Sequence, residues 1–212
     1  MNIYLVVEGP VGEKRVYAHW VPLVNPRLRV VSSLDMIVND HLIIVSGGGY
    51  PNYLEVIERG IMDVMEVIAV DSEDMSYDDK YQEIDNYVKS FRVQLNYKII
   101  VQHFCLETWA LGNQALVTRR PKDPKLREYR EMFDVLVRDP ELLPNYPKES
   151  LNRSQFAARY LKKLLNEKHK KLTYSKSNPI ALLHDKFYDR VKARLETTGH
   201  IHSFDNFLTA FV

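Results

Sequence analysis

The first hundred residues alternate between short apolar runs and longer segments with apolar residues at helical spacing. Ile3–Val7 is an apolar run rich in β-branched residues, which predicts a buried strand. Glu13–Val24 carries apolar residues four positions apart, which predicts a helix. Glu66–Val70 predicts another buried strand, and it ends directly on Asp71. Strands and helices are therefore expected in turn along this part of the chain.

The same signals predict the remaining elements of a sheet. Further strands are expected at Leu28–Val31, Leu42–Val45 and Lys98–Val101, and helices at Tyr53–Met65, Tyr81–Leu95 and Leu106–Leu116. Strands joined by helices of this length form parallel units, so we predict an α/β fold with a mainly parallel sheet flanked by helices. Ligands of such sheets bind at the carboxyl ends of the strands.

The character of the chain changes after about residue 120. Prolines separate short helical pieces, Gln155–Lys171 predicts a basic helix, and Ile180–Leu195 predicts an amphipathic one. The tail Phe204–Val212 is apolar enough to pack against the rest of the chain. We therefore expect residues 1–117 to form a sheet domain and residues 118–212 a basic, helical C-terminal extension.

Charge is distributed unevenly between the two halves of the chain. Residues 1–100 hold 9 Lys and Arg against 15 Asp and Glu, whereas residues 101–212 hold 20 against 13. A cation held in one half and a polyanion facing the other would explain this asymmetry, and chance variation between two solvated surfaces is the open alternative.

Composition also limits the class of protein. The single cysteine, Cys105, excludes an intramolecular disulfide framework and a zinc site with several cysteines. No apolar run approaches the about 20 residues that span a bilayer. The first residues lack the basic region of a secretory signal, so a cytoplasmic protein without a membrane partner is expected.

Carboxylates gather after two of the predicted strands. Glu8 and Gly9 follow the first strand, and Asp71, Glu73 and Asp74 follow the strand that ends at Val70. Alternate residues of an extended chain point the same way, so Asp71 and Glu73 can converge on one cation. Asp74 or Asp78 can instead cap the next helix. Because like charges repel unless a cation neutralises them, a divalent metal is the functional interpretation and a solvated acidic loop the alternative.

A third segment, His103–Asn113, follows the strand Lys98–Val101. Its apolar residues predict core packing, and Glu107 among them is a carboxylate that is costly to bury without a partner. His103 and Cys105 are not interpreted as metal ligands or as a nucleophile. An isolated cysteine is more often a small buried apolar residue.

These acidic positions resemble the Toprim domain, which topoisomerases, primases, recombination factors and OLD-type nucleases share. Its pattern is a hydrophobic strand ending in Glu-Gly and a later strand ending in Asp-x-Asp, matched by Leu5–Gly9 and Asp71-Ser72-Glu73. Phe104–Asn113 is similar to a stretch of RloB-like proteins, which are associated with bacterial defence. Those relatives often carry a further Glu after Glu-Gly, matched by Glu13. Glu73 departs from the family's Asp, with Asp74 beside it.

The resemblance covers about residues 1–117 and implies a Toprim-like (Rossmann-like) fold with metal-dependent phosphodiester chemistry. Asp71 with Glu73 or Asp74 would hold Mg²⁺ or Mn²⁺, and Glu8 would be a further ligand or a general acid or base. Glu107 would join the catalytic residues. The chain is too short for the strand-handling domains of a topoisomerase, so a nuclease fits better than a topoisomerase or a primase.

The basic half would then bind the backbone of a nucleic acid. The candidate residues are Arg119, Arg120, Lys162, Lys163, Lys170 and Lys171. DNA and structured RNA such as tRNA both remain open, with a role as an effector of antiviral defence in bacteria. The competing hypotheses are a partner-dependent or non-catalytic subunit of a separate ATPase or sensor, and a small-molecule phosphohydrolase. In the former, the tail Phe204–Val212 would serve self-association or docking.

Overall fold

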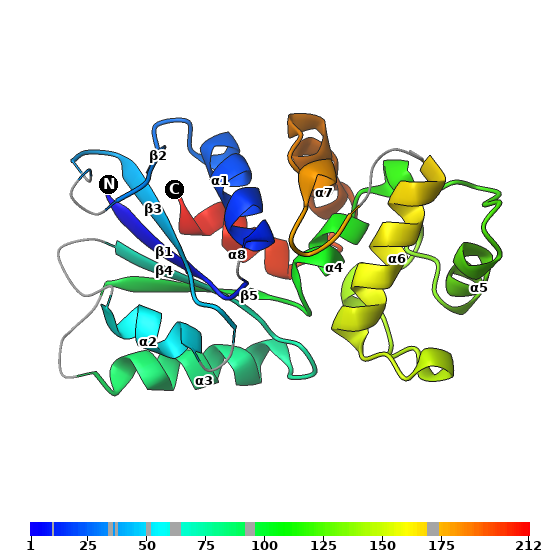
Figure 1. The fold of residues 1–212 in the computed structure, drawn as a ribbon, viewed down its shortest axis with the longest axis horizontal. Coiled ribbons are helices and arrows are strands. Elements are labelled where there is room, and N and C mark those ends of the chain that lie inside the picture. Colours follow the sequence, from blue (N-terminus) through cyan, green and yellow to red (C-terminus); the bar gives the residue numbers. More distant parts are fainter. Residues whose placement is uncertain are drawn as a thin grey trace.

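Five parallel strands form one sheet in the part of the chain that the structure describes (Figure 1). The structure is a computed structural model, and it describes residues 1–9, 11–33, 36, 38–49, 52–59, 65–91, 96–168 and 174–212. The strand order is β2-β3-β1-β4-β5. Their bounds are β1 (Ile3–Val7), β2 (Arg29–Val31), β3 (His41–Ser46), β4 (Met65–Asp71) and β5 (Tyr97–Gln102). The predicted α/β class is confirmed.

Helices cover both faces of this sheet and continue beyond one end of it. Helices α1 and α8 lie on one face, α2 and α3 lie on the other, and α4 to α7 lie beyond one end of the sheet (Figure 1). Their bounds are α1 (Gly12–Val24), α2 (Asn52–Arg59), α3 (Tyr77–Lys89), α4 (Leu106–Leu111), α5 (Pro124–Met132), α6 (Arg153–Lys168), α7 (Asp185–Thr198) and α8 (Ser203–Ala210). None of the helices described is both long and apolar enough to cross a membrane.

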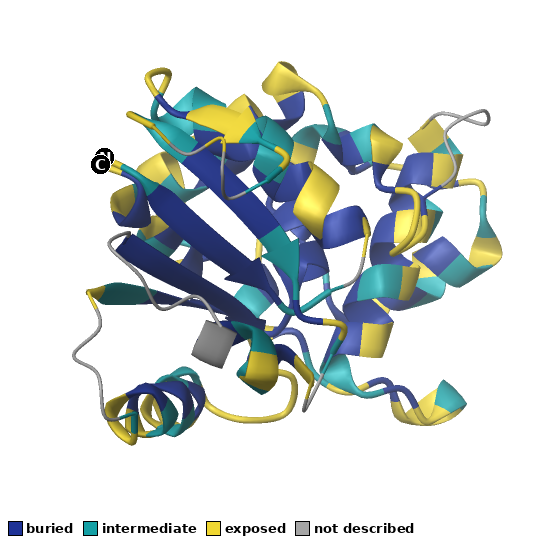
Figure 2. Cartoon of the chain, turned by 60° about the vertical axis from the view of Figure 1, so that its left-hand side comes forward, coloured by how far each residue is buried: buried dark blue, intermediate teal, exposed yellow. Residues whose placement is uncertain are grey.

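Side-chain alternation along the strands produces two cores. In β4, Val67 and Ala69 belong to the core beneath α1 and α8, whereas Ile68 and Val70 belong to the core above α2 and α3. The central strands are buried over almost their whole length (Figure 2). By the same alternation, Asp71 is directed to the face that α1 covers.

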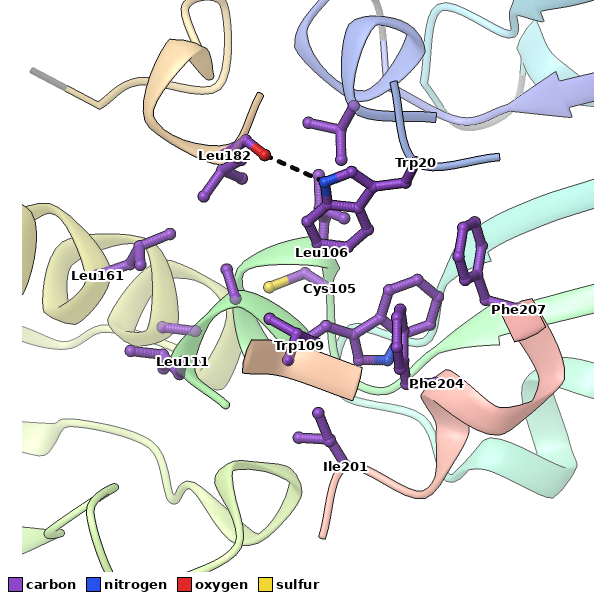
Figure 3. Packing of buried hydrophobic residues seen from close by; sticks show 14 of the residues in the cluster. Trp20, Cys105, Leu106, Trp109, Leu111, Leu161, Leu182, Ile201, Phe204 and Phe207 are labelled. Carbon is purple, nitrogen blue, oxygen red and sulfur yellow. Dashed lines mark hydrogen bonds between the residues drawn. The ribbon is translucent and has the colours of Figure 1, made fainter. Parts of the chain in front are cut away.

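The larger core joins the sheet to the extension. Trp20 of α1 packs against Phe187 of α7. Trp20 and Trp109 of α4 both contact Phe204 and Phe207 of α8 (Figure 3). The predicted packing of the apolar tail is therefore confirmed. The division of the chain at residues 117 and 118 remains a prediction, since both parts contribute to one continuous core.

Several predicted helix ends are wrong for identifiable local reasons. The helix expected from Tyr81 begins a turn earlier, because the Ser76 hydroxyl accepts a hydrogen bond from Asp79 N at 3.1 Å and caps it. Neither Asp74 nor Asp78 is the cap. Met65 begins β4 rather than ending a helix, since α2 ends at Arg59.

Two more predicted helices divide into shorter pieces. The helix expected over Leu106–Leu116 stops at Leu111 before Gly112, and a short 3₁₀ turn, Gln114–Leu116, follows. The helix expected over Ile180–Leu195 is a 3₁₀ turn followed by α7. The parts of the expected helices at 60–64, 92–95 and 169–171 lie outside the described residues.

The shared aromatic core predicts a large stability effect for one side chain of the tail. Phe207 of α8 is fully buried against α1 and α4, so Phe207→Ala should lower the free energy of unfolding by about 3–5 kcal/mol. Urea denaturation measures this. Leu142→Ala, at a side chain that is 67% exposed, is the control and should change stability by less than about 0.5 kcal/mol. Equal effects of the two substitutions would mean that α8 does not belong to the core.

Candidate metal centre

Two predicted site residues, Glu8 and Asp71, meet at the point where the order of the strands in the sheet reverses. The chain runs from β1 to β3 on one side of β1, and then to β4 on the other side. The carboxyl ends of two such strands form the crevice where open α/β sheets bind ligands. Glu8 follows β1 and Asp71 ends β4, and Asp71 N donates a hydrogen bond to Glu8 Oε2 at 3.1 Å.

Glu13 lies in the first turn of α1, directly above this edge. Its Oε2 accepts a hydrogen bond from Gly9 N at 2.5 Å, and its Oε1 accepts one from the Gln102 side chain at the end of β5. A Cβ at residue 9 would lie 2.6 Å from Glu13 Oε2, so glycine allows the carboxylate to reach the backbone. Glu13 thus links the first loop to β5. In the sequence, only the resemblance to the Toprim family pointed to this residue.

Glu107 approaches from the first turn of α4, where it is buried. Its Oε1 accepts a hydrogen bond from the Tyr174 hydroxyl at 2.7 Å, so a residue of the extension holds it in place. The same segment continues to Lys176, whose carbonyl oxygen would lie 1.7 Å from a Cβ at Gly12. Only glycine at position 12 permits this close approach. The segment 174–179 therefore closes over the start of α1.

A cavity of about 50 Å³ lies between these elements, large enough for a few water molecules or a partly hydrated ion. The residues that line it include Glu13, Asp71, Glu107, Tyr174, Lys176 and Pro179. The sequence analysis pointed to neither Lys176 nor Tyr174 as a residue of this site. Both are brought to the site by tertiary packing of the extension.

The carboxylates in this group make one another harder to ionise. Burial raises the pKa of Asp71 well above its usual value, and the charges of Glu13 and Glu8 raise it further. Burial also raises the pKa of Glu13 to about 7, and the negative charges of Glu8 and then Glu107 act in the same direction. The pKa of Glu8 is raised by burial too, although the hydrogen bond from Asp71 N opposes this.

Lys176 is the cation at the cavity wall. The charge of Glu107, followed by that of Asp71, raises the pKa of its ammonium group, so Lys176 is protonated at neutral pH. One ammonium charge does not balance the carboxylates of Glu8, Glu13, Asp71 and Glu107. Protons or a bound cation must supply the remaining positive charge.

The donor set suits a hard divalent cation. Asp71 Oδ1 is buried and has no hydrogen-bond partner among the described residues, and carboxylate oxygens are the ligands that Mg²⁺ and Mn²⁺ prefer. Across the described residues, no group of three or more His, Cys, Asp or Glu side chains already has the spacing of a metal cage. Magnesium often uses only one or two carboxylates, with waters and substrate phosphates as the other ligands. Asp71 with Glu8 or Glu13 fits that mode.

No protein-family model, curated protein or solved structure matches this chain. The interpretation of the site therefore rests on its own residues and their geometry.

Glu73 and Asp74 lie outside the cavity. The extended conformation expected over Asp71–Glu73 ends at Asp71, because Glu73 adopts a left-handed backbone with φ of 50° and donates its N–H to Phe104 O at 3.0 Å. Alternation then no longer directs Asp71 and Glu73 to the same side. Both Glu73 and Asp74 are exposed, and their roles as metal ligands remain predictions.

The two residues that the sequence analysis set aside also lie near this edge. Cys105 is a free, fully buried thiol, and burial raises its pKa well above the usual value, so it is not poised as a nucleophile. His103 is half-buried, and its Nδ1 lies 2.8 Å from the hydroxyl of the buried Ser72. Burial lowers the pKa of His103, which keeps it neutral.

The candidate nucleic-acid-binding residues occupy a different part of the molecule. Arg119 and Arg120 are exposed and line an open hollow of about 520 Å³ together with Arg127 of α5; we call this the arginine hollow. Lys162 is exposed on α6, whereas Lys163 forms an ion pair with Asp123 at 2.7 Å. Lys170 and Lys171 lie outside the described residues.

The raised pKa of Glu13 predicts a pH-dependent effect on stability. Its folded value of about 7 lies above the unfolded value near 4.5, so the folded state retains the proton longer and Glu13 destabilises the fold as pH rises between these values. Without divalent cations, Glu13→Gln should therefore gain in unfolding free energy relative to wild type across this window. Urea denaturation at several pH values measures the difference. Glu196→Gln, at an exposed site, should show none, and a constant difference for Glu13→Gln would contradict the burial of its charge.

Proposed function

We propose that this chain is a divalent-metal-dependent nuclease that hydrolyses phosphodiester bonds in DNA or in a structured RNA. The observation that carries the proposal is the convergence of Glu8, Glu13, Asp71 and Glu107 at the switch point of the sheet. There, Asp71 Oδ1 is buried and accepts no hydrogen bond from any residue that the structure describes. Such a site has more carboxylates than its own cation can balance. A bound Mg²⁺ or Mn²⁺ would complete it.

Asp71 is the central ligand in this proposal, with Glu8 or Glu13 beside it. When bound, the ion would stabilise negative charge on the phosphate and lower the pKa of a water molecule. Glu8 binds Asp71 N through Oε2, and no described residue forms a hydrogen bond with Oε1. Because Glu8 is only half-buried, this oxygen can exchange a proton with the attacking water or with the leaving oxygen.

The remaining residues position these groups and attract the substrate. The Tyr174 hydroxyl fixes the Glu107 carboxylate, which keeps a further negative charge at the cavity. Lys176 offers positive charge to a phosphate that would otherwise be repelled by the carboxylates. The arginine hollow would hold the backbone elsewhere along the polymer, and such contacts position a substrate without reading its sequence. The role in bacterial defence rests on the resemblance to RloB-like proteins.

A second candidate function is supported by the closed geometry of the site. The cavity of about 50 Å³ is too small for a nucleotide, and Tyr174 and Lys176 close it from the side of the extension. A partner-dependent subunit, restrained until an ATPase, a sensor or a second copy of the chain moves the segment 174–179, would have this arrangement.

Cleavage is the direct test of the proposed function. Labelled plasmid, single-stranded DNA and total tRNA are incubated with Mg²⁺ or Mn²⁺. Loss of a residue that only supports a metal ligand typically lowers activity about 10–100-fold, so Glu8→Ala and Asp71→Asn should each reduce cleavage by at least that factor. Glu196→Ala is the control carboxylate, exposed on α7. Glu73→Ala and Asp74→Ala test whether an exposed carboxylate contributes. Wild-type activity in Asp71→Asn would refute the assignment, whereas an inactive wild type would favour the partner-dependent subunit.

Metal binding is tested separately from activity by thermal unfolding. Mn²⁺ should raise the Tm of the wild type at pH 8 and leave that of Asp71→Asn unchanged, because a ligand that binds only the folded state stabilises it. The variant retains the shape of the side chain and lacks its charge. Equal shifts in both proteins would place the cation elsewhere.

The arginine hollow predicts a salt-dependent contribution to nucleic-acid binding. Arg119→Ala with Arg120→Ala should weaken binding of both DNA and tRNA and reduce the slope of log K against log salt by about 2, roughly one unit for each phosphate that an arginine no longer neutralises. Fluorescence anisotropy between about 50 and 200 mM salt measures this slope. Lys89→Ala with Lys192→Ala removes the same charge from α3 and α7 and should leave the slope unchanged.

A further inference from the structure

A second cavity, of about 280 Å³, lies between the end of α4 and helices α6 and α7. Its inner wall is formed by the buried side chains of Leu116, Leu165 and Phe187. Its volume is just below the range of about 300–1,000 Å³ that is typical of ligand pockets. An apolar wall of this kind suits the body of a small organic molecule.

Asn113 adds an unmet hydrogen-bond donor to this wall. The residue is only 1% exposed, and its Oδ1 accepts a hydrogen bond from Ala115 N at 3.2 Å, which caps the 3₁₀ turn. Its Nδ2 has no hydrogen-bond partner among the described residues. A buried amide N–H without an acceptor is costly, and native structures generally supply one. A ligand with a hydrogen-bond acceptor at its apolar end would supply the missing partner for Asn113 Nδ2.

Positive charge lies at the mouth of the same cavity. Lys186 and Arg190 are four residues apart on α7, so they share one face of the helix, and both are exposed. No described residue forms an ion pair with either of them. None of the described residues lining the cavity is acidic, and His184 is the third basic group there. The cavity therefore has an apolar interior, a polar donor and a basic rim.

We propose that this cavity binds a nucleotide, with its base against Phe187 and Leu116 and its phosphate at Lys186 and Arg190. A ring nitrogen or carbonyl of the base would accept the Asn113 amide proton. A fatty acid would meet the basic rim and the apolar wall, but it has no acceptor for Asn113. Inorganic phosphate would use the rim alone. A nucleotide is the class that uses all three features.

The position of the cavity connects it to the acidic site. Helix α4 carries Glu107 in its first turn and is followed by Gly112 and Asn113. The segment that begins with Tyr174 and Lys176 continues through His184 into α7. The nucleotide can be free or can be the terminal nucleotide of a nucleic acid, since both present the same chemistry. The binding itself does not depend on the proposed nuclease activity.

Calorimetric titration of the full chain in EDTA tests the proposal. The ligands are adenosine and uridine 5′-monophosphate, a short oligonucleotide with and without a 5′-phosphate, decanoate and inorganic phosphate. We expect saturable binding of a nucleoside monophosphate or of the 5′-phosphorylated oligonucleotide, and which of the two binds identifies the source. Lys186→Ala with Arg190→Ala should weaken it about tenfold or more, because the charge-assisted hydrogen bonds to phosphate are removed. Lys192→Ala, on the same helix outside the cavity, is the control.

Asn113→Asp separates nucleotide recognition from simple anion binding. The substitution retains the acceptor for Ala115 N, removes the amide donor and adds a negative charge that repels any anion. It should therefore weaken nucleotide binding by a larger factor than it weakens binding of inorganic phosphate, and leave the folded state detectable by circular dichroism. Absence of saturable binding, unchanged affinity in the Lys186 and Arg190 variant, or equal affinity for decanoate or inorganic phosphate would each overturn the proposal. Because no metal is present, an inactive acidic site would not affect these results.

Discussion

Asp71, whose Oδ1 is buried, lies beside Glu8 and Glu13, and each of these carboxylates raises the free energy of ionising the others. The surrounding structure offsets part of that repulsion with hydrogen bonds from Asp71 N to Glu8 and from Gly9 N and Gln102 to Glu13. These donors stabilise negative charge but do not neutralise it. The parallel strands bring the carboxylates together because β1 and β4 are neighbours whose carboxyl ends share one edge. A fold that retains this arrangement must take up protons or a cation there.

The C-terminal extension also contributes residues to this acidic site. Its segment 174–179 supplies Tyr174 to Glu107 and Lys176 to the cavity, and glycine at position 12 allows the backbone to approach. Contacts outside the cavity maintain that approach, because Trp20 Nε1 donates a hydrogen bond to Leu182 O at 3.0 Å (Figure 3). The Trp20 ring also packs on Phe187. Removing the extension would therefore expose the aromatic core and would also remove the ammonium group that faces the carboxylates.

The sequence predicted the elements whose signals are local. Apolar runs such as Ile3–Val7 and Glu66–Val70 located buried strands, and the position of Glu8 and Asp71 directly after strands placed both at one edge. Glu107 was recognisable because a carboxylate among core residues needs a reason to be there. The turn at Glu73 was not predictable, because a left-handed backbone leaves no pattern in a Glu side chain. Tyr174 and Lys176 reach the site only through tertiary packing, which residue spacing does not encode.

Binding of the proposed cation and access of the proposed substrate would require different positions of the segment 174–179. In its present position the cavity of about 50 Å³ accommodates an ion with a few waters, and Tyr174 keeps Glu107 directed at it. The proposed phosphodiester substrate would need more room, so the segment would have to move while the carboxylates at the ends of β1 and β4 and on α1 stay in place. The carboxylates are fixed by backbone hydrogen bonds within the sheet and α1, whereas the segment is held mainly through Tyr174 and the aromatic contacts of α7. The segment 174–179 continues into α7, so a ligand at the basic rim of α7 would bind the same stretch of chain that closes the acidic site.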